Sequence, residues 1–135
     1  MSRREIREHI FKLLFLLEFY TGDELNEQAE FYMDEVEKAA PAAEEKQYIA
    51  EKFRRIESEL PEIDQKLTEV SSGWKLKRMN KVDLAILRLA AYEAMKDEEI
   101  PTGVAINEAV ELAKKFGGDD SPSFVNGVLA KLVKE

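Results

Sequence analysis

The chain has no cysteine and only one histidine, His9, so several common kinds of site are excluded at once. Without thiols it has no disulfide, no Cys-ligated zinc or iron–sulfur cluster and no cysteine nucleophile. A di-metal bundle needs Glu-x-x-His pairs, and Ile6 stands three residues before His9. No glycine-rich phosphate loop with a following lysine is present. We therefore expect a protein of the reducing cytoplasm that is not an enzyme and holds no metal or cofactor.

Long apolar runs are lacking as well. The run over residues 10–17 is interrupted by Lys12 and is followed by Glu18, so it is too short to span a membrane. It also lacks the small-residue cleavage site of a signal peptide. A chain of 135 residues buries roughly two-thirds of its unfolded surface without needing a disulfide or metal. We expect a soluble, cytoplasmic protein with no membrane partner.

The alternation of apolar and polar residues that is typical of strands is absent, and almost every segment has helical periodicity. Ser2 is a suitable N-cap for the first helix, and Gly117-Gly118 suggests a left-handed C-cap after the sixth. The segment 82–95 is apolar at 11 of 14 positions, which predicts a helix enclosed by neighbours. The sequence predicts an all-α fold of two small helical bundles packed together, at residues 1–71 and 72–135. The predicted helices cover residues 2–20, 23–39, 43–59, 61–70, 82–95, 101–116 and 122 onward.

Positive charge is scarce overall but concentrated in two places. The formal net charge is −8, divided as +2 over residues 1–15, −10 over 16–71, +4 over 72–81 and −4 over 82–135. An acidic chain disfavours indiscriminate phosphate binding, while local basic clusters can still contact a nucleic acid. Ordinary solvated helix faces are the alternative interpretation of the two clusters.

The first basic cluster consists of Arg3, Arg4, Arg7 and Lys12 on the polar side of the first helix. Guanidinium groups match phosphate geometry, and a helix N-terminus adds backbone N–H donors. The second cluster contains Lys75 and Lys77, with Arg78 and Lys81. RNA-binding proteins often combine such basic groups with rings on which bases stack. The candidate rings are Phe15, Trp74 and Phe124, and burial in the core is the alternative for each.

Several short motifs of the second half occur in a recognisable order. They are WKLKRM at 74–79, VDLAILR at 82–88, YE at 92–93, AINEAVELAK at 105–114, FG at 116–117, DS at 120–121 and FVNGVL at 124–129. In residues and spacing, this series resembles the NusB family of transcription antitermination proteins. The arginine-rich beginning is similar too, whereas residues 21–70 match only as helices of suitable length.

The resemblance implies a function without catalysis. NusB proteins bind boxA, a single-stranded element of nascent ribosomal RNA, together with the ribosomal protein NusE. The complex joins RNA polymerase, which then reads through terminators, and some members of the family form homodimers. By position, the resemblance implies RNA contacts at Arg3, Arg4, Arg7, Phe15, Asp120 and Phe124, and a contact with the partner protein at Asp83.

Two other interpretations are open at this point. A NusB-like bundle also forms the RNA-binding part of a family of RNA cytosine methyltransferases, and we expect no such catalytic domain after Glu135. The other alternative is a protein-interaction scaffold that never meets RNA. RNA binding predicts that the three N-terminal arginines share a side with residues 75–81 and 117–121. Within the apolar segment 82–95, we expect Arg88 and Glu93 to be paired charges at the edge of the core.

Overall fold

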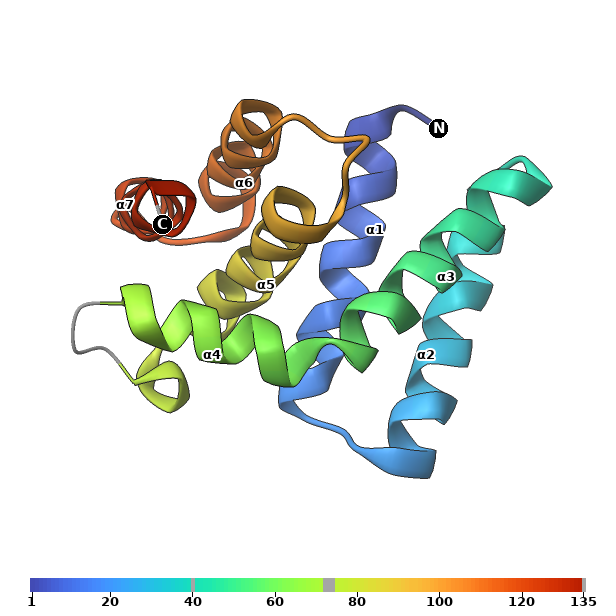
Figure 1. Cartoon of the computed structure of the whole chain (residues 1–135). Coiled ribbons are helices and arrows are strands. Elements are labelled where there is room, and N and C mark those ends of the chain that lie inside the picture. The colour runs from blue at the N-terminus through green and yellow to red at the C-terminus, as the bar shows by residue number, and fades with distance from the viewer. Residues whose placement is uncertain (40, 72–74, 135) are drawn as a thin grey trace. The chain divides into compact units, whose positions relative to one another are not determined.

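The computed structural model describes residues 1–39, 41–71 and 75–134, and these ranges are almost entirely helical (Figure 1). Trp74 lies outside the described residues. Within those ranges there are seven α-helices and no strand, which confirms the predicted all-α fold. The α-helices are α1 (Arg3–Phe15), α2 (Gly22–Glu37), α3 (Ala43–Ser58), α4 (Leu60–Val70), α5 (Lys81–Lys96), α6 (Thr102–Phe116) and α7 (Ser121–Lys134). Two 3-10 turns, η1 (Leu16–Glu18) and η2 (Leu76–Arg78), follow α1 and precede α5.

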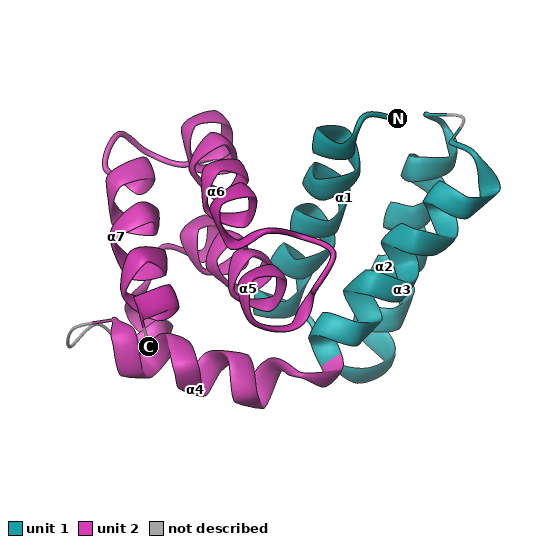
Figure 2. Cartoon of the chain, turned by 45° about the horizontal axis from the view of Figure 1, so that its top comes forward, with its two compact units in different colours: residues 1–57 teal, residues 58–135 magenta. Residues whose placement is uncertain are grey.

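The chain divides into two compact units, Met1–Glu57 and Ser58–Glu135 (Figure 2). The sequence prediction placed the division after residue 71, so the two boundaries differ by the whole of α4. The physical reason is packing, since α4 contacts α5 and α7. Ile63, Leu67 and Val70 form the buried face of α4.

In the N-terminal unit, α1 begins as the sequence predicts. The Ser2 hydroxyl accepts the backbone N–H of Glu5 at 3.1 Å, and the Glu5 carboxylate accepts the backbone N–H of Ser2 at 3.3 Å. This reciprocal capping box satisfies two amides that have no partner inside the helix. The α-helix α1 ends at Phe15, and the chain continues as the 3-10 turn η1. The α-helix is therefore shorter than the predicted helix, which reached Tyr20. The largest fully buried side chains of this unit are Ile10, Leu13, Leu14, Ile49, Phe53 and Ile56.

In the C-terminal unit, α5 is the central helix. It contacts α4, α6 and α7, and every residue from Asp83 to Glu93 is buried. This confirms the prediction from its nearly continuous apolar sequence. No helix among the described residues is both long enough and apolar enough to cross a membrane.

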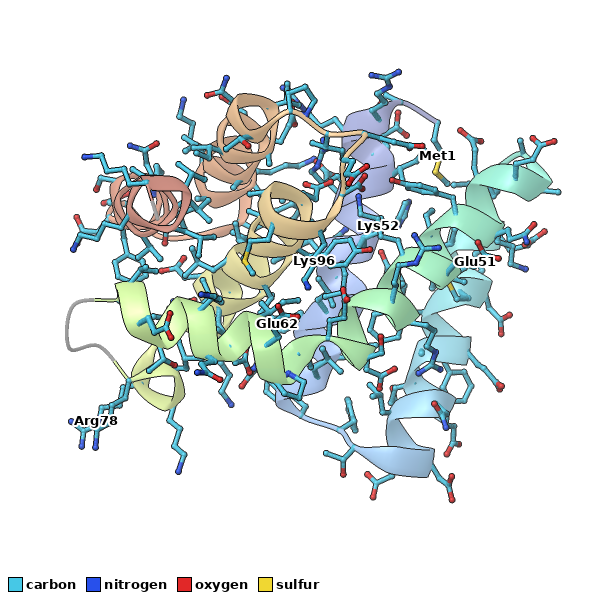
Figure 3. The ribbon with its side chains drawn as sticks, viewed as in Figure 1. Met1, Glu51, Lys52, Glu62, Arg78 and Lys96 are labelled. Atoms are coloured by element: carbon cyan, nitrogen blue, oxygen red, sulfur yellow. The ribbon has the colours of Figure 1, made fainter. Side chains whose placement is uncertain are left out.

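The burial of α5 makes its charged residues depend on partners. Arg88 donates to both oxygens of Asp64 on α4, from Nε at 3.0 Å and from a terminal nitrogen at 2.9 Å. The Arg88 side chain is only 11% exposed, so this bidentate pair lies at the edge of the core, as predicted for Arg88. A second pair, Lys96 with Glu62 at 2.7 Å, also joins α5 to α4 but is more exposed (Figure 3).

We predict that Asp64→Ala lowers the free energy of unfolding by about 2 kcal/mol, because it removes the bidentate carboxylate partner of the largely buried Arg88 guanidinium. Glu62→Ala is the matched control on the same helix. It removes the exposed pair with Lys96 and is expected to cost at most about 1 kcal/mol. Chemical denaturation monitored by circular dichroism measures both. Equal losses in the two variants would contradict the distinction.

Candidate nucleic-acid interface

The beginning of α1 is held in place by local hydrogen bonds. Glu5, which interrupts the run of arginines, is the capping residue described above. The backbone N–H and hydroxyl of Ser2 lower the pKa of the Glu5 carboxyl, so it stays charged. The Met1 ammonium lies 2.9 Å from a carboxylate oxygen of Glu45 on α3, where hydrogen bonding raises the pKa of the amine and lowers that of Glu45. The acidic groups near the arginines therefore order the helix start.

The three N-terminal arginines are not equivalent. Arg3 and Arg4 are exposed and Arg7 is half-buried. Arg4 and Arg7 interact with other groups of the described chain. All three side chains come from the first two turns of α1, so a single helix positions them.

His9 and Tyr32 connect α1 to α2. The His9 Nδ1 atom lies 2.7 Å from the Tyr32 hydroxyl, at hydrogen-bonding distance. Burial lowers the pKa of His9 and raises that of Tyr32 to about 12. A neutral imidazole bonded to a neutral phenol is a packing contact, which agrees with the interpretation of His9 as a packed side chain rather than a general base.

Phe15 closes the last turn of α1 and is half-buried. Its ring meets the ring of Phe19 edge to face, with centroids 5.1 Å apart and an interplanar angle of 63°. Phe19 is 51% exposed and directly follows η1. Sequence reasoning singled out Phe15 but missed Phe19. The available signal was the four-residue spacing between them.

The second basic cluster surrounds η2. Lys75, Lys77 and Arg78 are all exposed, and Figure 3 shows Arg78 directed away from the ribbon. No carboxylate of the described ranges forms an ion pair with these three side chains. Met79, which follows them, is buried and ties the cationic turn to the unit. The cluster thus presents three unneutralised charges on a short, anchored segment.

The connection from α6 to α7 passes close to neighbouring atoms at Gly117, but Gly117 does not have a left-handed backbone conformation. Gly117 has φ −94° and ψ −172°, and among the described glycines only Gly22 has a positive φ, so the predicted left-handed C-cap is wrong. Glycine fits here because a Cβ would lie 2.5 Å from the Ser121 hydroxyl oxygen and 2.9 Å from the Ala113 carbonyl oxygen. The buried Ser121 hydroxyl accepts the N–H of Gly118 at 3.0 Å. Close packing, rather than backbone handedness, accounts for the residue.

Two predicted site residues lie at the start of α7. The Asp120 carboxylate is exposed, and its backbone carbonyl accepts the N–H of Phe124 at 3.0 Å. Phe124 is half-buried in the first turn of the helix. The ordered loop therefore places a carboxylate and a ring within one turn of each other.

Asp83 lies in the first turn of α5 and is 7% exposed. Asn80 caps this helix by accepting the backbone N–H of Val82 at 2.8 Å and that of Asp83 at 3.3 Å. One oxygen of the Asp83 side chain, Oδ1, is buried without a hydrogen-bond partner among the described residues. A buried acceptor without a donor is costly and uncommon in folded proteins. The Asp83 carboxylate is thus held inside the unit with one oxygen that no described donor satisfies.

Each unit therefore gathers part of the predicted site. Arg3, Arg4, Arg7 and Phe15 lie along α1, while Lys75, Lys77, Asp83, Asp120 and Phe124 lie in the C-terminal unit. That the arginines share a side with residues 75–81 and 117–121 stays a prediction.

Known proteins with a similar sequence identify the family. The NusB family pattern matches residues 4–134. The chain belongs to the NusB family. The transcription antitermination protein NusB of Lachnoclostridium phytofermentans is 56% identical over 98% of this chain and 99% of that protein. Its counterpart in Agathobacter rectalis is 55% identical, over 97% and 98% of the two chains.

Solved structures agree with the NusB fold. The NusB protein of T. maritima has a TM-score of 0.88 and 36% identity, covering 100% of this chain and 92% of the other. A chain in the crystal structure of a plectonemic RNA supercoil has a TM-score of 0.83 at 24% identity, covering 98% of this chain and 94% of its own, a likeness that concerns the fold. The resemblance seen in the sequence motifs is thereby confirmed.

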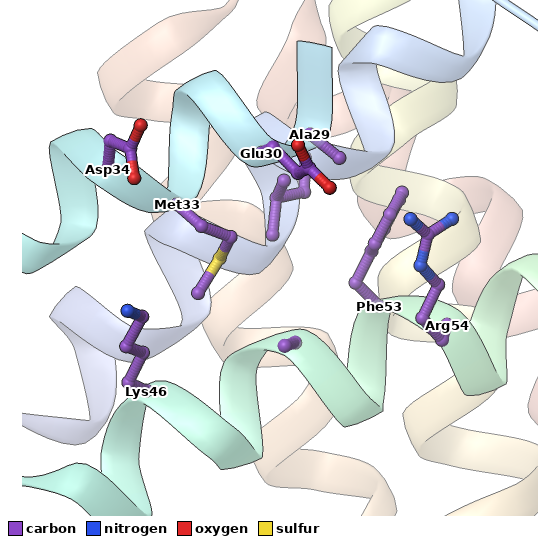
Figure 4. Close-up of a pocket in the computed structure, with 9 residues that line it drawn as sticks. Ala29, Glu30, Met33, Asp34, Lys46, Phe53 and Arg54 are labelled. Atoms are coloured by element: carbon purple, nitrogen blue, oxygen red, sulfur yellow. The ribbon is translucent and has the colours of Figure 1, made fainter. Parts of the chain in front are cut away.

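A half-open cavity of about 340 Å³ in the N-terminal unit is lined by none of the residues that the NusB resemblance implies (Figure 4). Leu13 and Phe53 are among its apolar lining, and Glu30 and Asp34 on α2 face Lys46 and Arg54 on α3. Both cations already have partners, Lys46 with Glu37 and Arg54 with Glu57. Among the described residues no three histidine or acidic side chains are placed to hold a metal ion.

We predict that Gly117→Ala destabilises the protein by about 1–3 kcal/mol, since the added methyl overlaps Ser121 and the end of α6. Gly127→Ala is the control. It adds the same atom inside α7 with no other atom within 4 Å, and is expected to stabilise by about 0.5–1 kcal/mol. Thermal unfolding compares the two. A stabilised Gly117→Ala variant would show that the close approach is not required.

Proposed function

We propose that the protein is an RNA-binding transcription antitermination factor of the cytoplasm. It binds boxA RNA of ribosomal RNA operons together with the ribosomal protein NusE, and promotes read-through by RNA polymerase. The observation that carries this proposal is the match to named antitermination proteins over almost the whole chain. The polar groups of the two units supply chemistry suited to that role, and the mechanism is binding alone.

RNA affinity comes first from the arginines of α1. The capping box already occupies the amides of Ser2 and Glu5, so backbone N–H groups at this helix start contribute less than the sequence suggested. The guanidinium groups are then the main donors to phosphate oxygens. Because the chain as a whole is acidic, binding depends on these local charges and is sensitive to salt.

The C-terminal unit adds contacts of different kinds. Lys75 and Lys77, with Arg78, are exposed and available to phosphates. The Asp120 carboxylate repels phosphate but accepts hydrogen bonds from base amino groups or ribose 2′-hydroxyls, which differ between RNA sequences and between RNA and DNA. Phe124, one turn further on, offers a ring edge or face to a base. Lysines supply affinity here, while the loop and the ring supply selectivity.

NusE docks on the α5 side of the C-terminal unit. The Asp83 carboxylate carries a negative charge near the surface of α5, and its Oδ1 has no described donor, so it attracts a basic partner protein. The negative net charge of this chain favours the approach of such a partner. Self-association of the free protein into a homodimer is an alternative to these contacts.

We predict that Arg3→Ala combined with Arg7→Ala weakens boxA binding and reduces the slope of log affinity against log salt by about 1.4, because two phosphate contacts to a single strand are lost at about 0.7 each. Fluorescence anisotropy across a salt series measures both quantities. Lys38→Ala with Arg54→Ala is the matched control, since it removes the same charge from surface ion pairs of the same unit. An unchanged slope in the α1 variant would contradict the assignment of Arg3 and Arg7 to phosphate contacts.

We predict that Asp83→Asn weakens NusE binding at least about tenfold and leaves RNA binding by the protein alone unchanged, because it removes the charge without changing shape. Asp83→Lys is expected to impair docking further, and circular dichroism checks that it folds. Glu98→Gln, an exposed acid of the same unit, serves as the control. Titration calorimetry with NusE and anisotropy with boxA RNA give the two readouts. Equal damage to both would contradict this assignment.

A further inference from the structure

We infer that Phe19, together with Phe15, forms a stacking platform for an RNA base at the end of α1. The inference rests on the proposed RNA binding and adds to it a residue that the family resemblance did not indicate. It concerns one unit only, because α1, η1 and Phe19 all lie within Met1–Glu57.

The first observation is the placement of the rings relative to the cations. Arg4, Glu8, Lys12, Phe15 and Phe19 are separated by four, four, three and four residues. At about 100° per residue, the first four positions fall within one sector of α1, and Phe19 follows directly after the 3-10 turn η1 with its ring against Phe15. Of the buried residues of α1, Ile10, Leu13 and Leu14 lie on the other side of the helix, while Phe11 borders this stripe. The polar stripe of the helix therefore ends in two aromatic rings.

The second observation is the geometry of the rings. Phe15 meets Phe19 edge to face at 5.1 Å, and the Tyr20 ring lies 6.5 Å from Phe19 at 59°. These neighbours hold the Phe19 ring, which nevertheless remains 51% exposed, whereas the core ring Phe53 is 2% exposed. About half of the Phe19 surface is thus open to water on a supported, oriented ring. This is the arrangement that a base needs for stacking.

A comparison within the same unit explains why RNA is the occupant. Phe31 on α2 is equally exposed, at 58%, but the positions one turn away from it are Glu27, Gln28, Asp34 and Glu35. A phosphate is repelled there. Along the Phe19 stripe, Arg4 and the exposed Lys12 alternate with Glu8, so the cations can hold the backbone while the uncharged ring takes a base. Proteins that bind single strands commonly combine cations that contact the backbone with aromatic rings on which the bases stack.

The test compares Phe19→Leu, which keeps an apolar side chain without a ring, with Phe31→Leu. The probe is boxA RNA, used both with an end label and with the fluorescent base 2-aminopurine placed at successive positions. Phe19→Leu is expected to weaken binding roughly tenfold, as for the loss of one stacked base. Its salt slope should stay that of the unchanged protein, because no charge is lost. It should also abolish quenching of 2-aminopurine at one position, and Phe19→Trp should restore both affinity and quenching.

Each other outcome points elsewhere. If Phe19→Leu binds like Phe31→Leu while the unchanged protein binds boxA RNA, the stacking platform is refuted and RNA binding stands. If the unchanged protein shows no salt-dependent RNA binding, the proposed function itself fails. If Phe19→Leu alters only the sedimentation coefficient, the rings belong to a contact between two copies of the chain, and the inference is overturned.

Discussion

The enclosure of α5 is the constraint on which the C-terminal unit depends. A helix that is buried from Asp83 to Glu93 has no solvent-facing stripe, so each polar group on it needs a partner. Arg88 finds one in Asp64, and this bond fixes α4 against α5. Asp83 does not find a donor for Oδ1 within the described chain. The same burial that organises the core thus leaves one carboxylate oxygen without a donor among the described residues.

The basic residues of the two units differ in whether acidic residues lie beside them. The net charge of −8 opposes general attraction of nucleic acid, so affinity must arise from short segments where cations outnumber acids. The acids near the arginines of α1 stabilise the start of that helix. Glu5 caps it, and Glu45 on α3 binds the terminal amine. At η2, Lys75, Lys77 and Arg78 have no carboxylate partner among the described residues. Positive potential is thus local and attached to ordered backbone.

The sequence predicted the helices well because apolar spacing reports directly on burial, and it predicted the family because the motifs of residues 74–129 keep their spacing. It failed where tertiary contacts decide. The reason for Gly117 is the approach of Ser121, a contact between two helices that no local pattern reveals. The unit boundary moved because α4 packs with α5. The burial of Asp83 and the exposure of Phe19 are likewise properties of packing: a helical wheel places both residues but does not say how much of each remains in water.

Separating cations from rings along α1 has a consequence for recognition. Phosphate contacts are nearly independent of sequence and weaken with salt, whereas stacking is insensitive to salt and depends on an unpaired base. On the proposed role, a flexible single strand places its backbone at Arg4 and Lys12 and a free base at the rings one to two turns further on. Double-stranded RNA offers the first but not the second, because its bases are already stacked. Selectivity for single strands would then follow from the order of residues on one helix, before any base-specific contact is made.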